Sequence, residues 1–572
     1  MNARKPYAGK SRKLIIAIDV GTTFSGVSYS ILDPGQVPQV CGVNRFPAQE
    51  HAGGDSKIPS VLLYDKSGNV RAAGAETLQE DMMELAIDEG WFKSEWFKLR
   101  LRPRGSDPDP ALAALPPLPP NKSIVDVFAD FLSYLFDCAR TYIKEIQPTG
   151  AKFWSTIANN IDFVLTHPNG WEGQQQSLMR QAAVQGGLVA DSDEGKGRVS
   201  FVTEGEASLH FCLSRGLVVD GMKVGDGKGV VIVDAGGGTV DLSAYAQVRK
   251  GADVSYTEIA PAQCLFKGAI MVKRNAQAYI EARLRNSKFS ERTEDIVDAF
   301  DKSTKLTFKN AKTPAYVKFG GISDNDAAYD VKGGKLVIPG SEVAKFFQPT
   351  ITSISQAVLK QRKQAKSGIS SIFLVGGFAA SSFLYSQLCE SLAPLGLDVC
   401  RPDNHMNKAV ADGGVLYVVD HHVTARVARF TYGTNGSIQY QKKNKEHSKR
   451  RLNTHFGTDW RPKGIQVTET QEFSVDMMQQ YEVWGPYTRH AISAPIQVYR
   501  GNIHHPSWTD VDAANFGVLC TVKADVTAAV SRLVPRRRAD SRTYFQLEYE
   551  VVLLFGLTEL KAQLRWFANV CS

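Results

Sequence analysis

The chain has 572 residues, which predicts two to four domains because a single hydrophobic core does not grow that large. Its 43% hydrophobic and 22% charged residues are an ordinary globular composition, and no apolar run reaches the roughly 18 residues of a membrane span. The net charge of +8 is concentrated in basic clusters at residues 442–451 and 535–538, which lack the interleaved aromatic residues of a nucleic-acid surface. We therefore expect neither a nucleic-acid nor a membrane partner.

Eight cysteines are scattered along the chain, and no two of them form a Cys-x-x-Cys pair. Scattered thiols are typical of a reducing compartment, and this spacing argues against a zinc site. The basic N-terminal segment lacks the apolar core of a signal peptide. We expect a cytoplasmic protein, with a nuclear location as the alternative.

The first elements in chain order are a tail, a hairpin and a helix. Residues 1–12 are expected to form a disordered tail. From Leu14 an apolar strand enters the turn DVGTTFSG and returns as the alternating strand VSYSI, which indicates a hairpin. The prolines of residues 103–120 exclude a regular helix and predict a surface connection. Ser123 and Asp126 then form a capping pair at the start of an amphipathic helix.

Three further strands precede a change of pattern. The first covers residues 163–166 and ends at His167, the second is VVIVDA after a glycine-rich segment, and the third is SIFLVGG before the helix ASSFLYSQLCESL. After about residue 419, short segments of period-two alternation replace the helical stripes. The sequence therefore predicts an α/β domain over residues 13–419 and a smaller β-rich domain over residues 420–572.

Two strand-and-turn segments, IAIDVGTTFSG and VVIVDAGGGTVDLS, match each other. Asp19 aligns with Asp234 and Gly21 with Gly236, which indicates two repeated lobes. Glycines let backbone N–H groups approach an anion, and threonine hydroxyls add donors. The aspartates would repel a bare phosphate, so we expect a cation between them. The pair predicts a nucleoside triphosphate site that is not a P-loop, because GxxxxGK[ST] is absent.

These segments resemble the two phosphate motifs of the actin/hexokinase/heat-shock-chaperone superfamily, and the second is closest to that of the heat shock protein 70 chaperones. SIFLVGGFAASSFL resembles the adenosine motif, while FVTEGEASLHF and NKAVADGGVLYVV resemble the two connecting helices. All five motifs occur in the family order. The chain is thus similar to divergent heat shock protein 70-like ATPases. The resemblance implies a two-lobed actin-like domain of duplicated ribonuclease H-like folds.

The resemblance also assigns roles to four acidic residues. Asp19, Glu204 and Asp234 are expected to hold Mg²⁺, mostly through water, with K⁺ as a further candidate ion. Asp234 would in addition orient the attacking water. Asp241 matches an acid that supports this group. The four acids are all present, which favours an active site.

Basic and hydroxyl side chains complete the expected catalytic set. Lys98, with Lys93 as the alternative, would neutralise charge that develops during phosphoryl transfer. Thr22 and Thr239 would contact the γ-phosphate. Pro168, in LTHPNGW, matches a proline that relays the nucleotide state, and an ordinary strand-ending proline is the alternative interpretation.

The nucleotide, ATP or ADP, is expected to lie against backbone at three glycine turns. Gly268 and Lys305 match family positions near ribose or phosphate and near adenine. Where the standard chaperones have a serine and an arginine in the adenosine motif, this chain has Phe378 and Ala380, so an aromatic ring could stack on adenine in place of the arginine. The remaining expected contacts are Gly21, Thr22, Thr23, Phe24, Gly236, Gly237, Gly238, Thr239, Gly376 and Gly377.

Three functions are compatible with these motifs. The first is a chaperone-like ATPase, in which slow hydrolysis of ATP to ADP and phosphate controls a β-rich domain that binds client polypeptides, with co-chaperones as further partners. The second is a pseudo-ATPase that binds nucleotide and regulates a partner without turnover. The third, a small-molecule kinase, fits poorly because the second motif continues as a chaperone-type strand. We expect no helical lid and therefore no clamping of a peptide by one.

Overall fold

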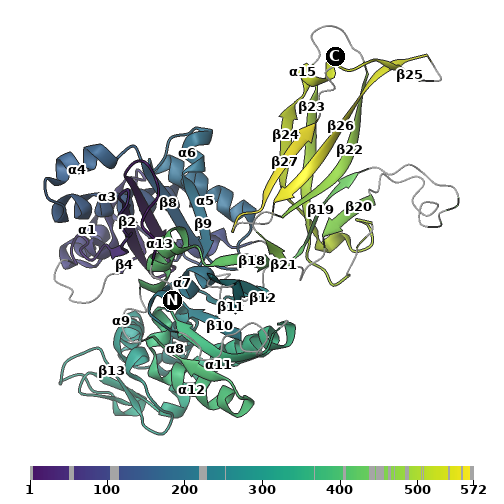
Figure 1. Ribbon diagram of the computed structural model, residues 1–572. Helices are drawn as coiled ribbons and strands as arrows, with labels where there is room; N and C mark the ends of the chain where they lie inside the picture. Colours follow the sequence, from purple (N-terminus) through teal and green to yellow (C-terminus); the bar gives the residue numbers. More distant parts are fainter. Residues whose placement is uncertain are drawn as a thin grey trace. The chain divides into compact units, whose positions relative to one another are not determined.

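The computed structural model divides the chain into two compact units, Met1–Trp171 with Gln175–Val423 and Glu172–Gln174 with Thr424–Ser572 (Figure 1). The first unit combines helices with mixed sheets, which confirms the predicted α/β class. The structure describes residues 4–49, 57–103, 115–217, 229–250, 253–365, 367–402, 408–436, 443, 445, 457–461, 466–468, 471–482, 489–503, 506, 508–538, 541–554 and 558–566.

The first sheet of the α/β unit contains β1 (Lys13–Asp19), β2 (Phe24–Leu32), β3 (Cys41–Gly42), β8 (Ile161–His167) and β9 (Val199–Thr203). Its order is β3-β2-β1-β8-β9, and β4 (Ile58–Pro59) pairs with the start of β2. β1 and β2 form the predicted antiparallel hairpin, whereas β1 pairs in parallel with β8 and β8 in parallel with β9. Nearly all residues of β1 and β8 are buried because both strands lie inside the sheet.

The second sheet contains β10 (Gly229–Ala235), β11 (Val240–Lys250), β12 (Asp253–Leu265), β16 (Ile369–Val375) and β17 (Asp398–Cys400). Its order is β17-β16-β10-β11-β12. β10 and β11 form an antiparallel hairpin, and β10 pairs in parallel with β16, which pairs in parallel with β17. The run β11-β10-β16-β17 therefore repeats the run β2-β1-β8-β9, as expected from the two matching sequence segments.

Helices cover these sheets and close two large apolar cores. Ser123 and Asp126 form the predicted capping box, since each side chain accepts the other's backbone N–H, at 3.2 and 2.8 Å. The α-helices of the unit are α1 (Glu80–Glu89), α3 (Ile124–Ile146), α4 (Gly150–Ile157), α5 (Gly173–Gln185), α6 (Asp193–Gly197), α7 (Glu204–Ser214), α8 (Ala269–Leu284), α9 (Thr293–Ala299), α10 (Lys305–Thr307), α11 (Gly340–Gln364), α12 (Ser382–Leu392) and α13 (Ala409–Asp420).

Helices α7 and α13 pack against each other, and α13 also packs on β1 and β2. Their closest approach needs a glycine, because a Cβ built on Gly413 would lie 1.9 Å from the carbonyl oxygen of Ala207. These are the two segments that resemble the connecting helices of the family. The remaining strands form two small sheets, β6 (Val70–Ala73)-β5 (Val61–Tyr64)-β7 (Phe92–Glu95) and β13 (Ala315–Lys318)-β15 (Lys335–Ile338)-β14 (Val331–Lys332).

The second unit is built mainly from antiparallel strands around an apolar core that includes Ile496 and Val551. Among its described residues lies one short α-helix, α15 (Thr527–Val530). One sheet is β20 (Gly457–Arg461)-β19 (Thr431–Gly436)-β23 (Ala491–Tyr499)-β24 (Phe516–Asp525), and the other is β22 (Glu472–Glu482)-β26 (Thr543–Leu554)-β25 (Arg536–Arg537), with β27 (Lys561–Trp566) beside β26. Strands β18 (Val423–Val427) and β21 (Gln466–Thr468) form a further pair.

The N-terminal residues differ from the predicted disordered tail. The Arg4 guanidinium donates to the Asp420 carboxylate at 2.6 and 2.9 Å, and the backbone of Tyr7 exchanges hydrogen bonds with Gln36 and Gly35. Within residues 1–12, the described part is therefore anchored to the fold by contacts that are distant in sequence. Most of the predicted proline-rich connection, residues 104–114, lies outside the described residues, as does nearly all of the basic cluster at 442–451.

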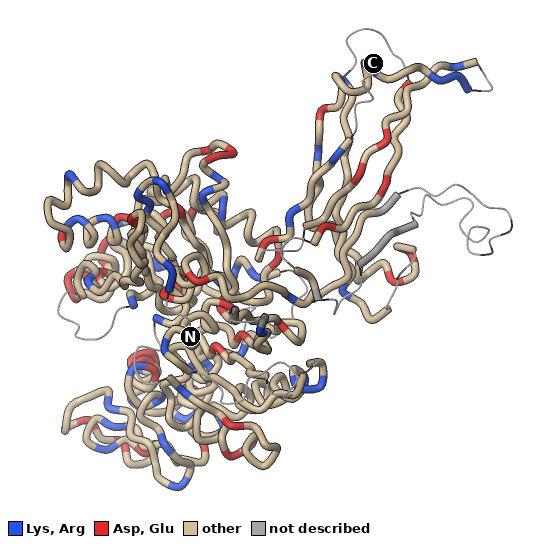
Figure 2. The backbone as a smooth tube through the Cα atoms, viewed as in Figure 1, with Lys and Arg blue, Asp and Glu red and all other residues tan. Residues whose placement is uncertain are grey.

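Basic and acidic residues are interspersed along the described backbone (Figure 2). A short basic stretch lies at β25 (Arg536–Arg537), within the second predicted basic cluster. No helix among the residues placed by the structure has the length and apolar character needed to cross a membrane.

Candidate functional site

A cavity of about 560 Å³ opens where the carboxyl ends of β1 and β10 face each other. β1 ends at Asp19, and β10 contributes Asp234 just before its own end. The cavity brings together nearly all of the predicted site residues; Asp241 and Gly268 are the two that do not line it. The predicted residues on its wall are Asp19, Gly21, Thr22, Thr23, Phe24, Lys98, Glu204, Asp234, Gly236, Gly237, Gly238, Thr239, Lys305, Gly376, Gly377 and Phe378.

The two glycine turns meet at the wall of this cavity. A Cβ built on Gly237 would lie 2.2 Å from Oγ1 of Thr23, and one built on Gly238 would lie 2.4 Å from Oγ1 of Thr22. Glycine is therefore needed at both positions for the turns to approach this closely. Gly268 supports the second turn from behind, since its own Cβ would lie 2.5 Å from the carbonyl oxygen of Gly237.

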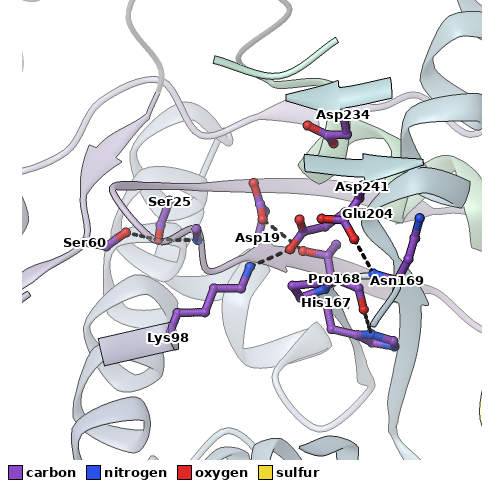
Figure 3. A network of polar contacts seen from close by, with 12 residues as sticks. Asp19, Ser25, Ser60, Lys98, His167, Pro168, Asn169, Glu204, Asp234 and Asp241 are labelled. Atoms are coloured by element: carbon purple, nitrogen blue, oxygen red, sulfur yellow. Dashed lines mark hydrogen bonds and ion pairs between the residues drawn. The ribbon is translucent and has the colours of Figure 1, made fainter. Parts of the chain in front are cut away.

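Lys98 and Glu204 form an ion pair in the wall of the cavity (Figure 3). Lys98 lies on the 3₁₀ helix Phe97–Leu101, and Glu204 is the first residue of α7; the Nζ–Oε1 distance is 2.5 Å. Burial opposes the charge of Lys98, but the carboxylates of Glu204 and Asp19 outweigh it and hold the pKa of Lys98 above its usual value. Lys98 thus places a buried ammonium group in the wall of the cavity, and its role near a γ-phosphate stays a prediction.

Lys93, the alternative lysine, also lines the cavity, but its side chain is 54% exposed and pairs with Glu95. Lys98, by contrast, is 4% exposed and points toward the acids. Of the two candidates, the geometry therefore favours Lys98.

Asp19 has a cationic partner that sequence reasoning missed. Nζ of Lys57 lies 2.8 Å from Oδ2 of Asp19, and the Thr166 hydroxyl donates to Oδ1 at 3.0 Å. Burial raises the pKa of Asp19, but the ammonium groups of Lys57 and Lys98 reverse this effect and lower it. Asp19 is therefore a carboxylate with both oxygens engaged.

The surroundings of Asp234 and Asp241 stabilise a negative charge less well than those of Asp19 do. Burial, together with the neighbouring Glu204, raises the pKa of Asp234 to about 7, although the Ser208 hydroxyl donates to its Oδ2 at 2.9 Å. Burial likewise raises the pKa of Asp241 well above its usual value. These two acids therefore lack the strong ammonium partner that Asp19 and Glu204 each have.

The segment that contains Pro168 joins the two sheets. The backbone N–H of Asn169 donates to Oδ1 of Asp241 at 2.6 Å, and the Asn169 amide donates to the Ser243 hydroxyl at 2.9 Å. On the other side of the proline, His167 donates from Nδ1 to the Pro168 carbonyl at 2.9 Å (Figure 3). Pro168 thus lies between a buried histidine of the first sheet and a buried acid of the second.

The acidic residues predicted to hold a metal ion do not form a site that would coordinate the ion directly. Among the residues that the structure describes, no group of three His, Cys, Asp or Glu side chains could hold a metal ion. Asp19 and Glu204 are instead paired with lysine ammonium groups at 2.8 and 2.5 Å. Direct ligation of Mg²⁺ does not fit this arrangement, and binding through water stays a prediction.

Comparison with known proteins places the chain among relatives of one kind. No protein-family model matches it. It is 24% identical to heat shock 70 kDa protein 12A of Mus musculus over 638 aligned residues, covering 96% of this chain and 89% of the relative. It is also 24% identical to heat shock 70 kDa protein 12B of Homo sapiens, covering 74% of this chain and 71% of the relative. The chain is a divergent heat shock protein 70-like protein.

In this heat shock protein 70-like chain, Phe378 lines the cavity and is also part of the apolar core. The ring is 2% exposed and stacks on Phe347, with ring centroids 6.0 Å apart and an interplanar angle of 26°. The ring belongs to the apolar core that also contains Phe383, so little of it is exposed to the cavity that this residue lines. Core packing therefore leaves little of the ring exposed for stacking, and contact of Phe378 with adenine stays a prediction.

Two other predicted positions, Gly376 and Lys305, also line the cavity. Gly376 has φ +91°, and a Cβ there would lie 2.4 Å from Oδ1 of Asp234, so only glycine fits this turn. Lys305 lines the cavity and forms an ion pair with Asp301, one turn before it. A second pair, Lys273 with Asp298 at 2.7 Å, lies on the same wall. Charged pairs therefore line this part of the cavity.

Proposed function

We propose that this heat shock protein 70-like chain binds ATP in the cavity between its two sheets and hydrolyses it slowly. The observation that carries the proposal is the approach of Gly237 and Gly238 to Thr23 and Thr22 beside the buried Lys98–Glu204 pair. This joins backbone N–H groups that can approach phosphate, hydroxyl donors and one buried ammonium group. An actin-like fold built from two repeated lobes is part of the same proposal, supported by the repeated strand order.

The chain's own residues suggest how the reaction would proceed. The glycine turns would hold the phosphates, and Lys98 would neutralise the charge that develops on the transferred group. Asp234, fixed by Ser208, would orient the attacking water. Mg²⁺, bound through water, would supply additional neutralisation of the phosphates where it is present.

A route from the cavity to the rest of the chain is part of the proposal. Asp241 accepts the N–H of Asn169, the residue after Pro168, so a movement of either sheet relative to the other would disturb this contact. Helix α7 starts at Glu204 and packs on α13, which is followed at once by the second unit. Nucleotide state would thereby control the second unit, for which we propose client polypeptides or co-chaperones as partners in the cytoplasm.

A second candidate is supported by the Lys57–Asp19 pair. Because ammonium groups already engage Asp19 and Glu204, these acids are less available for the chemistry expected of them in an ATPase. A nucleotide-binding regulatory protein with little or no turnover would retain the same cavity. We therefore treat slow hydrolysis and regulation without turnover as the two outcomes that one assay must separate.

The test is phosphate release from ATP by the full chain, alone and with an unfolded polypeptide, together with the melting temperature with and without ATP. Mass action predicts that a bound nucleotide raises the melting temperature. Phosphate release stimulated by the polypeptide would support a chaperone-like ATPase. A raised melting temperature without release would favour the regulatory alternative, and no response of either quantity at millimolar ATP would refute nucleotide binding.

A further inference from the structure

Lys57 is positioned at the cavity by strand β4, which pairs with β2 next to the first glycine turn. It directly precedes β4, in which Ile58 pairs with Ser25 and Pro59 with Phe24 of β2. Beyond β4, the Ser60 N–H donates to the Thr23 carbonyl at 2.9 Å, and the Ser60 and Ser25 hydroxyls are 2.8 Å apart. The backbone on this side of Lys57 is therefore tied to the turn that would hold phosphate.

The side chain of Lys57 is packed against its neighbours and is mostly buried. A Cβ built on Gly26 would lie 3.6 Å from Cγ of Lys57 and 3.7 Å from Cβ of Ala411 on α13. The aliphatic stem is thus packed beside β2 and the first turn of α13, and the side chain as a whole is 16% exposed. Burial of the stem limits the positions that the ammonium group can take.

The ammonium group occupies the place where a cation would act on Asp19. It contacts Oδ2 at 2.8 Å, the other oxygen accepts the Thr166 hydroxyl, and Lys57 itself lines the cavity. A hydrated cation that used Oδ2 would have to displace this ammonium group. The charge that Asp19 would otherwise present to a phosphate is therefore already compensated from within the chain.

We propose that Lys57 is a resident counter-ion of Asp19 that lets the cavity bind nucleotide phosphates without a divalent cation. The inference rests on the proposed nucleotide site and concerns which positive charge serves that site. With Lys57 in place, the first turn presents its N–H groups beside a neutralised aspartate. Without it, Asp19 would repel the phosphates unless a metal ion took over the compensation.

The experiment is calorimetric titration of the full chain with ATP, once with excess Mg²⁺ and once with EDTA. For the wild type we expect dissociation constants that differ by less than about tenfold between the two conditions. Lys57→Met should lose at least about tenfold in affinity in EDTA and regain most of it with Mg²⁺, because a metal ion can then reach Asp19. Lys57→Arg, which keeps the charge, should still bind in EDTA.

A control substitution is available at Lys13, at the opposite end of β1 from Asp19. Lys13 begins β1 and pairs with Asp162 at 2.5 Å, outside the cavity, so Lys13→Met removes a similar ion pair and should bind ATP as the wild type does. The melting temperature of each variant without ATP shows whether it is folded. If Lys57→Met does not fold, ATP binding by the wild type and by Lys57→Arg in EDTA still tests whether the cavity needs a divalent cation.

The outcomes separate this inference from the function on which it rests. Wild-type binding that requires Mg²⁺ would overturn the role of Lys57 and leave nucleotide binding intact, and so would equal binding of Lys57→Met and wild type in EDTA. Absence of wild-type binding in both conditions would overturn the proposed nucleotide site and the inference together. Binding of the wild type in EDTA that Lys57→Met loses and Lys57→Arg keeps would support it.

Discussion

Lys98 and Glu204 are joined by an ion pair of 2.5 Å although 106 residues separate them in the sequence. The pair connects the 3₁₀ helix Phe97–Leu101 to the first residue of α7, and both side chains are buried. It therefore fixes the start of a helix that packs on α13 and, at the same time, places an ammonium group in the cavity. The pair would therefore contribute both to stability and to any chemistry in the cavity, and substitutions can separate these two contributions.

Lys98→Met should lower the free energy of unfolding by roughly 3–5 kcal/mol, because it leaves the Glu204 carboxylate buried without its partner. The double variant Lys98→Met/Glu204→Gln should recover most of that loss, since no unpaired charge remains. Urea denaturation followed by tryptophan fluorescence measures both changes. If the pair also serves phosphoryl transfer, the double variant should regain stability without regaining phosphate release.

The exposed pair of Lys345 with Glu342 supplies the control for Lys98→Met. Its lysine side chain is 69% exposed, and Lys345→Met should change stability by no more than about 0.5 kcal/mol. An equal effect of both substitutions would contradict the assignment of Lys98 to a buried, structural ion pair.

Phe378→Leu should lower the stability of the chain by about 1 kcal/mol and change the affinity for ATP by less than about threefold. The reason is that most of the ring packs on Phe347 and Phe383 inside the core, although Phe378 also lines the cavity. Thermal denaturation and calorimetric titration measure the two quantities on the same samples. A large loss of affinity with unchanged stability would instead restore the adenine-stacking role expected from the sequence.

Local patterns in the sequence were sufficient for the strands, turns and caps that position the site. The alternation and glycine turns around Asp19 and Asp234 predict two hairpins, and the Ser123–Asp126 spacing predicts a capping box, because each depends on residues close together in the chain. The order of the five motifs then places Lys98 and Glu204 at one site. These are the parts of the fold in which neighbouring residues determine the geometry.

Contacts between segments that are distant in the sequence could not be predicted from local patterns. Lys57 reaches Asp19 because β4 pairs with β2, and nothing in the sequence around Lys57 predicts that pairing. The Phe378 ring faces the core because α11 presents Phe347 to it. The described N-terminal residues, from Arg4 onward, are held on the fold because Arg4 forms an ion pair with Asp420. Each of these contacts depends on tertiary packing, which overrides what the local sequence favours.

His167 should make the chain sensitive to mild acid. Burial lowers its pKa from 6.5 to about 4, and the neutral ring is held by the Pro168 carbonyl and by the Gln176 amide, which lies 3.0 Å from Nε2. Because the folded-state pKa lies below the unfolded value, the stabilisation is complete above pH 6.5 and is lost as the pH falls toward 4. The loss should amount to roughly 3 kcal/mol at the acid end of this range.

The difference between wild type and His167→Gln isolates this effect from the carboxyl groups that titrate in the same range. The variant lacks the ring that must lose or gain a proton, so its free energy of unfolding should fall less steeply between pH 6.5 and 4. Urea denaturation at several pH values measures the two curves. Parallel curves would show that His167 does not titrate as its burial predicts.

Asp19→Asn should reduce phosphate release much more than ATP binding. The substitution removes the negative charge of the first turn while keeping the side chain's shape, and it frees the Lys57 ammonium group, 2.8 Å away, to compensate the phosphates directly. We expect ATP affinity to stay equal or to increase, whereas release should fall by about 100-fold if Asp19 acts in the chemical step. Calorimetric titration and single-turnover phosphate release measure the two effects separately. Equal losses of binding and release would mean instead that Asp19 mainly supports the fold of the turn, in which case the melting temperature without nucleotide should fall as well.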